Sequence, residues 1–111
     1  MPSPQLPHHL KANRKRLALF QDDVAFLLGN QEGTQVSRYE SFGRVPPLET
    51  ALAYEVIMKR STSELFSGMY REAEKKVAKR ARALLQQIDN ATGPQAARRR
   101  SALADLAELS N

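Results

Sequence analysis

The spacing of apolar side chains divides the chain into short helical segments separated by glycine, proline and polar turns. Apolar positions recur at helical spacing over residues 21–28, stop at Gly29, and resume more sparsely over residues 34–41. Glycine adopts a positive φ at little steric cost, so Gly29 is a natural end for the first segment. We therefore predict two short helices joined by a turn over residues 29–33.

The second of these helices has few apolar residues to bury. Val36 and Tyr39 stand three residues apart on one face, and the other positions are mainly polar. A short helix with such a narrow apolar stripe is suited to presenting its polar face rather than to building a core. The major groove of B-DNA is wide enough to admit a helix. The competing interpretation is a surface helix that only holds the fold together.

Further helices are expected on both sides of this pair. Residues 9–18 and 48–58 have helical periodicity, and a short helix follows the Ser/Thr cluster at 61–63. With the pair they make a five-helix unit over residues 9–68, preceded by a proline-rich flexible arm over residues 1–8. The residues expected to form its core are Leu10, Leu17, Val24, Leu27, Leu28, Val36, Tyr39, Leu48, Leu52, Val56, Leu65 and Phe66.

The region after Gly68 has a different pattern. Residues 69–89 contain no glycine or proline, which predicts one long helix, and a second helix is expected over residues 95–109. Apolar side chains on the long helix recur at steps of three and four residues, close to the heptad period of a coiled coil. These seam residues are Tyr70, Ala73, Val77, Ala81, Leu84 and Ile88.

Such a seam must be covered by another surface. Packing within the same chain, pairing with a second copy and binding a different protein all stay open, and a homodimer is the interpretation we favour. There is an independent reason to expect a dimer if the helix over residues 34–41 enters a DNA groove. Two copies of this helix on a twofold axis can contact two DNA half-sites. The predicted dimer contacts are Tyr70, Val77, Ala81, Leu84 and Ile88. A dimer contact through the helix over residues 48–58 is the alternative.

Composition indicates an all-α protein, because helix-forming residues dominate and aromatic residues are few. There is no cysteine, so no disulfide framework or cysteine metal site is possible. No apolar run approaches the roughly 20 residues that a membrane span needs, and no secretory signal is visible. We expect a cytoplasmic protein that does not enter a membrane.

Catalytic motifs are missing from the sequence. The two histidines, His8 and His9, are adjacent, and there is no glycine-rich phosphate loop or plausible Ser–His–acid set. We therefore expect no catalytic residue, no metal and no cofactor.

The net charge of +5 is distributed unevenly. Residues 1–70 carry eight basic side chains against seven acidic ones, whereas residues 71–111 carry nine against five. A basic protein suits a polyanionic partner such as nucleic acid. The excess thus lies mostly in residues 71–111, where it can add nonspecific phosphate contacts or form a solvated helix face.

Particular residues point to a family. The run VSRYE at residues 36–40 is followed by a glycine and then by PLET at residues 47–50. Together with Leu10 to Arg14, Gln21, Ala25 and Gly29, these residues resemble the lambda-repressor-like helix-turn-helix regulators of the Cro/C1 or XRE type, over about residues 9–67. The chain departs from the family at Phe20, where an N-capping Ser or Thr is usual, and in a turn that is one residue longer.

The resemblance implies that residues 34–41 form a DNA-reading helix. Base contacts are then expected from Gly33, Thr34, Gln35, Ser37 and Arg38. Gln35 can form a bidentate pair with adenine, and Arg38 can reach guanine or a phosphate. Glu32 beside the groove is unfavourable unless it accepts a hydrogen bond from a cytosine amino group.

Two other residue roles follow from the resemblance. Gln21 is expected to contact a DNA phosphate at a helix N-terminus, where an anion is favoured, with Asp22 and Asp23 pointing away. Arg14 is expected to pair with Glu40 through a forked hydrogen bond that fixes the angle between their helices. The alternatives are an ordinary solvent-facing glutamine and two unpaired surface charges.

Arg44 follows the reading helix, where it can meet the phosphate backbone or remain a free surface charge. Taken together, the sequence predicts a dimeric, sequence-specific regulator that binds double-stranded DNA and represses transcription. The alternative is a protein–protein interaction module, adapter-like or antitoxin-like, built on the same helical fold. A further protein partner of the C-terminal helices is compatible with both.

Overall fold

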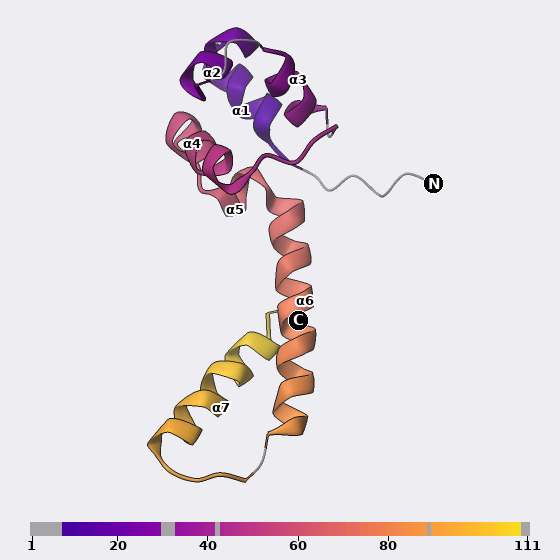
Figure 1. Ribbon diagram of the computed structural model, residues 1–111, viewed down its shortest axis with the longest axis vertical. Coiled ribbons are helices and arrows are strands. Elements are labelled where there is room, and N and C mark those ends of the chain that lie inside the picture. Colours follow the sequence, from indigo (N-terminus) through magenta and orange to yellow (C-terminus); the bar gives the residue numbers. More distant parts are fainter. Residues whose placement is uncertain (1–7, 30–32, 42, 89, 110–111) are drawn as a thin grey trace, which may run out of the picture. The chain divides into compact units, whose positions relative to one another are not determined.

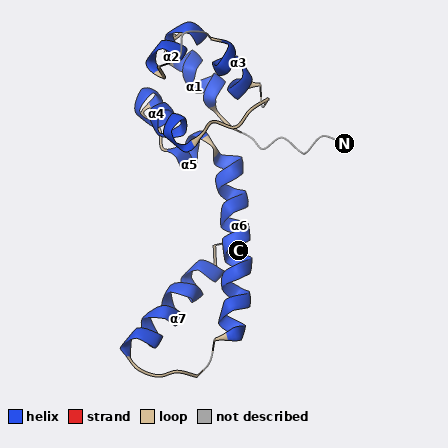
Figure 2. Ribbon diagram, viewed as in Figure 1, coloured by secondary structure: helices blue, strands red, loops and turns tan. Residues whose placement is uncertain are grey.

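The computed structural model describes residues 8–29, 33–41, 43–88 and 90–109. These residues form seven helices and no strand, so the prediction of an all-α protein is confirmed for the described part of the chain (Figures 1 and 2). The chain divides into two units, Met1–Met69 and Tyr70–Asn111, which we call unit 1 and unit 2. The predicted arm over residues 1–8 lies, apart from His8, outside the described residues, as do Glu32 and Phe42.

Unit 1 contains five short helices. Their bounds are α1 Leu10–Arg16, α2 Gln21–Leu27, α3 Thr34–Glu40, α4 Leu48–Met58 and α5 Thr62–Leu65. Helix α3 packs against both α1 and α2, and α4 packs against α5 (Figure 1). Each helix lies within a few residues of its predicted position.

The ends of α2 show how local chemistry sets its length. Phe20 precedes the helix in an extended conformation, and its ring has no acceptor for a cap. Asp23 makes up in part for the missing side-chain cap. Its Oδ2 accepts a hydrogen bond from the backbone N–H of Phe20 at 2.7 Å. At the other end Gly29 has a φ of +86°, the left-handed conformation predicted for it.

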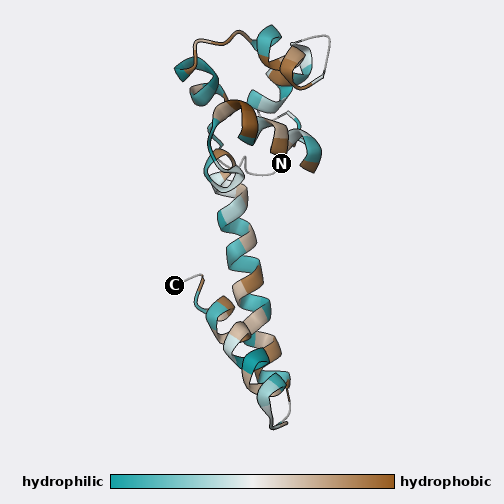
Figure 3. Ribbon diagram, turned by 90° about the vertical axis from the view of Figure 1, so that its left-hand side faces the viewer, coloured by the Kyte–Doolittle hydropathy of each residue, from teal (hydrophilic) through white to brown (hydrophobic). Residues whose placement is uncertain are grey.

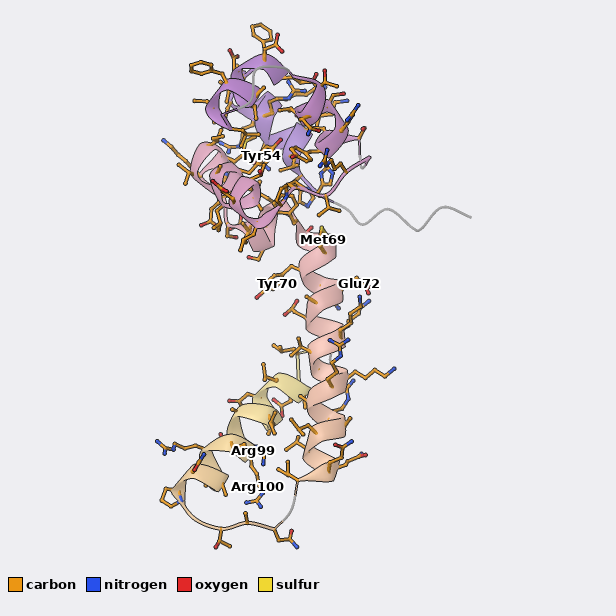
Figure 4. All side chains as sticks on the ribbon, viewed as in Figure 1. Tyr54, Met69, Tyr70, Glu72, Arg99 and Arg100 are labelled. Carbon is orange, nitrogen blue, oxygen red and sulfur yellow. The ribbon has the colours of Figure 1, made fainter. Side chains whose placement is uncertain are left out.

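The core of unit 1 is built around Tyr54, labelled in Figure 4. Its ring stands edge-on to Tyr39 and to Phe66, with centroids 6.2 and 6.5 Å apart. Burial raises the pKa of Tyr54, and its hydroxyl has no hydrogen-bond partner among the described residues. The full set of core residues is Leu10, Val24, Ala25, Val36, Tyr39, Tyr54, Met58, Leu65 and Phe66.

Four residues predicted to lie in this core are exposed instead. Leu27 on α2 is 54% exposed, and on α4 the exposed fractions are 74% for Leu48, 49% for Leu52 and 77% for Val56. Helix α4 carries apolar side chains around most of its circumference, so periodicity alone could not choose its inner face. Tyr54 and Met58 fill the core, and the stripe of Leu48, Leu52 and Val56 is left outside.

Unit 2 contains most of α6, which runs over Ser67–Gln87, and α7 over Pro94–Ala107. Arg82 on α6 donates from Nη1 to the backbone oxygen of Ala107 at 2.8 Å, which ties the C-terminal end of α7 to α6. Among the described residues of unit 2, only Ala78 and Ala81 are buried. Figure 3 shows that hydrophilic residues predominate on α6, whereas more hydrophobic segments occur in unit 1.

The predicted seam on α6 is therefore split. Ala81 is 4% exposed, so little of its surface is available to a second copy. Ile88 is partly buried, while Tyr70, Val77 and Leu84 are 52%, 39% and 38% exposed. Since α7 has 14 residues and α6 has 21, α7 cannot cover the whole length of α6.

No helix in the described parts of either unit combines the length and the apolar character that crossing a membrane requires.

Candidate nucleic-acid interface

Helix α3 has two sharply different sides. Val36, Tyr39 and Glu40 are buried, at 0%, 4% and 7% exposure. Thr34, Ser37 and Arg38 are exposed along the rest of the helix. The buried side joins the core of unit 1, so the polar side is held at the surface by the same side chains that stabilise the fold.

A buried ion pair fixes α3 against α1. Arg14 donates from Nε to Oε2 of Glu40 at 2.6 Å and from Nη2 to Oε1 at 3.0 Å, the forked geometry that the resemblance implies. A third guanidinium hydrogen bond runs from Nη1 to the backbone oxygen of Leu19 at 3.0 Å. The side chains of Arg14 and Glu40 are only 11% and 4% exposed. Hydrogen bonding to Glu40 raises the pKa of Arg14, so the guanidinium stays charged.

Gln21 joins the same cluster from α2. Its Nε2 donates to Oε1 of Glu40 at 3.2 Å, so one carboxylate receives donors from two other helices. The side-chain amide has a second N–H, and the first backbone N–H groups of α2 are at the same end. The structure thus brings Gln21, Arg14 and Glu40 together, and Gln21 is not an isolated surface residue.

Gly33 allows the start of α3 to approach the start of α2. A Cβ at this position would lie 2.6 Å from Oδ1 of Asp22 and 3.4 Å from Cβ of Gln21. Its φ of −71° is ordinary, so the requirement is for space rather than for an unusual backbone conformation. The carboxylate of Asp22 therefore lies near the N-terminal end of α3, where the helix dipole favours a negative charge.

Gln35 has an unusual environment for a base-reading residue. The residue is partly buried, and its Oε1 is enclosed without a hydrogen-bond partner among the described residues. A buried acceptor without a donor costs about 1–3 kcal/mol. To meet an adenine edge, this side chain has to turn outward from the position seen here.

Arg38 lies on the polar side of α3 and Arg44 follows the helix in sequence, and both are exposed. Neither is in an ion pair within the described part of the chain. The turn that connects them is closed by a hydrogen bond from the backbone N–H of Gly43 to the oxygen of Arg38 at 2.9 Å. Both guanidinium groups are therefore available to an anionic ligand.

The described residues contain no group of three or more His, Asp or Glu side chains that could hold a metal ion. The polar face of α3 and its neighbours thus offers amides, hydroxyls and guanidinium groups, which bind through hydrogen bonds and charge. This inventory suits recognition of an anionic, hydrogen-bonding surface.

Comparison of the chain with protein-family models, with curated proteins and with solved structures finds no match. The geometry of the chain itself is therefore what supports a function.

Sequence reasoning missed one polar feature of unit 1. A cleft of about 380 Å³ is lined by His8, Lys11, Ala12, Lys15 and Glu40, between the start of α1 and the end of α3. The spacing of Lys11 and Lys15, four residues apart on a predicted helix, places them on one face. That they border a cleft with Glu40 depends on the packing of α1 against α3, which periodicity does not reveal.

Proposed function

We propose that this protein is a sequence-specific double-stranded DNA-binding regulator of transcription, of the lambda-repressor-like helix-turn-helix type. The observation that carries the proposal is the two-sided character of α3, with Val36 and Tyr39 in the core and Ser37 and Arg38 exposed. A helix fixed in this way can enter the major groove as a rigid rod.

In this proposal α3 supplies the base contacts. Thr34, Ser37 and Arg38 are at the surface already, and Gln35 joins them after its side chain turns outward. Each well-formed bidentate contact gives about 1–3 kcal/mol of discrimination between bases. Turning the Gln35 side chain outward frees its Oε1 from a buried position without a hydrogen-bond partner among the described residues. This gain offsets part of the free-energy cost of the rearrangement.

Phosphate contacts position the helix in the groove. Gln21 and the first N–H groups of α2 face a phosphate on one side of α3, and Arg44 meets the backbone on the other. The link from Gln21 to Glu40 supports this role, since it fixes the start of α2 relative to the buried side of α3. Repression follows if the bound protein blocks access of RNA polymerase to a promoter.

We also propose that the active form is a homodimer. A single α3 reads only a few base pairs, whereas two copies on a twofold axis read two half-sites about one helical turn apart. The exposed side chains of Tyr70, Val77 and Leu84 on α6 support a contact of this kind. They are spaced seven residues apart, so they form one line along the helix.

A second candidate function is a protein–protein interaction module on the same fold. The specific observation that favours it is the apolar stripe on α4, where Leu48 and Val56 are 74% and 77% exposed. Phe20 at the start of α2 and Phe26 within α2 are similarly exposed, at 76% and 79%. Large exposed apolar side chains in one unit are typical of surfaces that bind other proteins.

Selection of bound duplexes from a random DNA pool tests the first proposal against the second. We expect a palindromic consensus, because a symmetric dimer requires two equivalent half-sites. The Arg38→Ala variant should then bind the selected duplex about 1–3 kcal/mol more weakly. A random duplex is the control, and its binding should change little. Failure to enrich any sequence, with full-length folded protein, overturns DNA reading and favours the interaction module.

A further inference from the structure

The cleft between α1 and α3 has walls that are fixed in place. The segment before α1 is anchored to α5, because the backbone N–H of His9 donates to the oxygen of Leu65 at 2.8 Å. The His8 ring stands edge-on to Phe66, with centroids 6.4 Å apart. Opposite, Glu40 is held by Arg14 and Gln21. The volume of about 380 Å³ is therefore a feature of the packed unit.

The charges around the cleft do not cancel. Lys11 and Lys15 are exposed, and neither is in an ion pair with a carboxylate among the described residues. Glu40 is the one carboxylate in the lining, and its charge is already balanced by the guanidinium of Arg14. Two ammonium groups one helical turn apart thus face the same cleft without a compensating anion.

His8 adds a polar wall rather than a third charge. Burial lowers the pKa of His8, although a hydrogen bond with the backbone of Tyr39 opposes part of this effect. The imidazole is therefore mainly neutral at physiological pH. The cleft is thus lined by two lysines, the imidazole of His8, the methyl group of Ala12 and the ion-paired carboxylate of Glu40.

We infer that this cleft binds a phosphate group through Lys11 and Lys15. On adjacent turns of a helix the Cβ atoms of such a pair are about 5–6 Å apart, so two flexible ammonium groups can converge on the oxygens of one tetrahedral anion. Lysine is a common phosphate ligand because it acts as a compact point charge with three donors. The space is ample for a phosphate together with the sugar attached to it.

Two sources share this chemistry: the backbone of a DNA duplex and a free phosphorylated small molecule. The first rests on the proposed function. Glu40 is the last residue of α3, so the cleft lies at the C-terminal end of the proposed reading helix. A phosphate held there would lie on the groove wall beside the reading helix. The phosphate site itself does not depend on DNA reading.

The site can be tested without DNA, by titrating the full-length chain with inorganic phosphate and following backbone amide resonances at constant ionic strength. We expect saturable shifts centred on Lys11, Ala12 and Lys15. The double variant Lys11→Gln/Lys15→Gln should weaken phosphate binding at least about tenfold. The reason is that losing a hydrogen bond to a charged group costs more free energy than a tenfold change in affinity represents. Lys59→Gln/Arg60→Gln, which removes two cations at the end of α4, is the matched control and should bind like the parent.

Binding of a duplex as a function of salt then identifies the source. If the phosphate belongs to DNA, the Lys11→Gln/Lys15→Gln variant should lower the slope of log affinity against log salt by about 0.9 for each DNA phosphate that is no longer neutralised. The control pair should leave the slope unchanged. An unchanged slope together with saturable phosphate binding identifies a small phosphorylated ligand instead.

The site is overturned if inorganic phosphate produces no saturable shift and the duplex slope is also unaffected, with amide spectra showing both variants folded. Failure of DNA reading is distinguishable, because it removes sequence selectivity while leaving the phosphate titration intact.

Discussion

Units 1 and 2 stabilise their helices in different ways. Unit 1 buries nine residues in its core, including four large side chains that no solvent reaches, Leu10, Tyr54, Met58 and Leu65. Unit 2 has longer helices, yet its buried described residues are two alanines. Helix length is therefore a poor guide to stability here, since most helical stability in proteins comes from packing an apolar face. Unit 1 therefore has a hydrophobic core of its own, whereas the described residues of unit 2 bury little apolar surface.

The largest expected effect is at the centre of unit 1. Tyr54→Ala removes a fully buried ring that contacts two other aromatic residues, and should lower the free energy of unfolding by about 3–5 kcal/mol. Val77→Ala on α6 should cost much less, because that side chain is 39% exposed. Urea denaturation of the full chain measures both variants, and equal losses would contradict the contrast between the units.

Tyr54→Phe provides a control for the ring itself. The hydroxyl is buried without a hydrogen-bond partner among the described residues, so its removal should be neutral or slightly stabilising. A loss comparable with that of Tyr54→Ala would mean that the hydroxyl makes a stabilising interaction in solution.

A second large effect is expected at the buried ion pair. Arg14→Met leaves the Glu40 carboxylate buried with only the donor from Gln21, and should destabilise the chain by about 3–5 kcal/mol. Replacing both partners, as Arg14→Met/Glu40→Leu, should recover most of the loss because no buried charge remains. Denaturation midpoints for the single and double variants give the comparison, and an equally unstable double variant would refute this account of the cost.

The predictability of unit 1 varied along the chain. Val36 and Tyr39 define the inner side of α3 by spacing alone, and Gly29 marks the end of α2 through its backbone freedom. Helix α4 was less predictable, because its apolar residues surround the helix and only packing selects Tyr54 over Val56. The hydrogen bond from Gln21 to Glu40 joins residues 19 positions apart, and no local pattern encodes it.

The same limit applies to unit 2. The periodicity predicted a seam along α6, but the buried residues of this helix are Ala78 and Ala81, of which only Ala81 belongs to the seam. A wide apolar stripe indicates that another surface packs against the helix. It does not indicate which residues of the stripe pack within the same chain. Tyr70, Val77, Leu84 and Ile88 remain predicted contacts with a second copy, whereas the burial of Ala81 leaves it little surface to offer.

The proposed dimer gives a smaller, concentration-dependent effect. Val77→Glu/Leu84→Glu places charges in the exposed line of α6 and should convert a dimer into a monomer in sedimentation equilibrium without unfolding unit 1. Leu52→Glu/Val56→Glu on α4 is the matched control and should leave the dimer intact. The reverse pattern would place the interface on α4.

The smallest expected effect concerns a single backbone position. Ala18 has a φ of 58°, a left-handed conformation that is costly for a residue with a Cβ. Ala18→Gly should stabilise unit 1 by about 0.5–1 kcal/mol, after the entropic cost of glycine is included. Thermal unfolding resolves a change of this size, and a decrease in stability would show that the Ala18 side chain contributes more than its backbone costs.

The convergence of Arg14 and Gln21 on one carboxylate has a mechanical consequence. Because Glu40 is bound from both α1 and α2, the end of α2 that would meet a phosphate and the helix that would meet the bases cannot shift independently. A duplex whose groove width does not match that fixed separation must itself bend or twist. Under the proposed function, the stiffness of the DNA at positions the protein never touches would then contribute to the choice of operator.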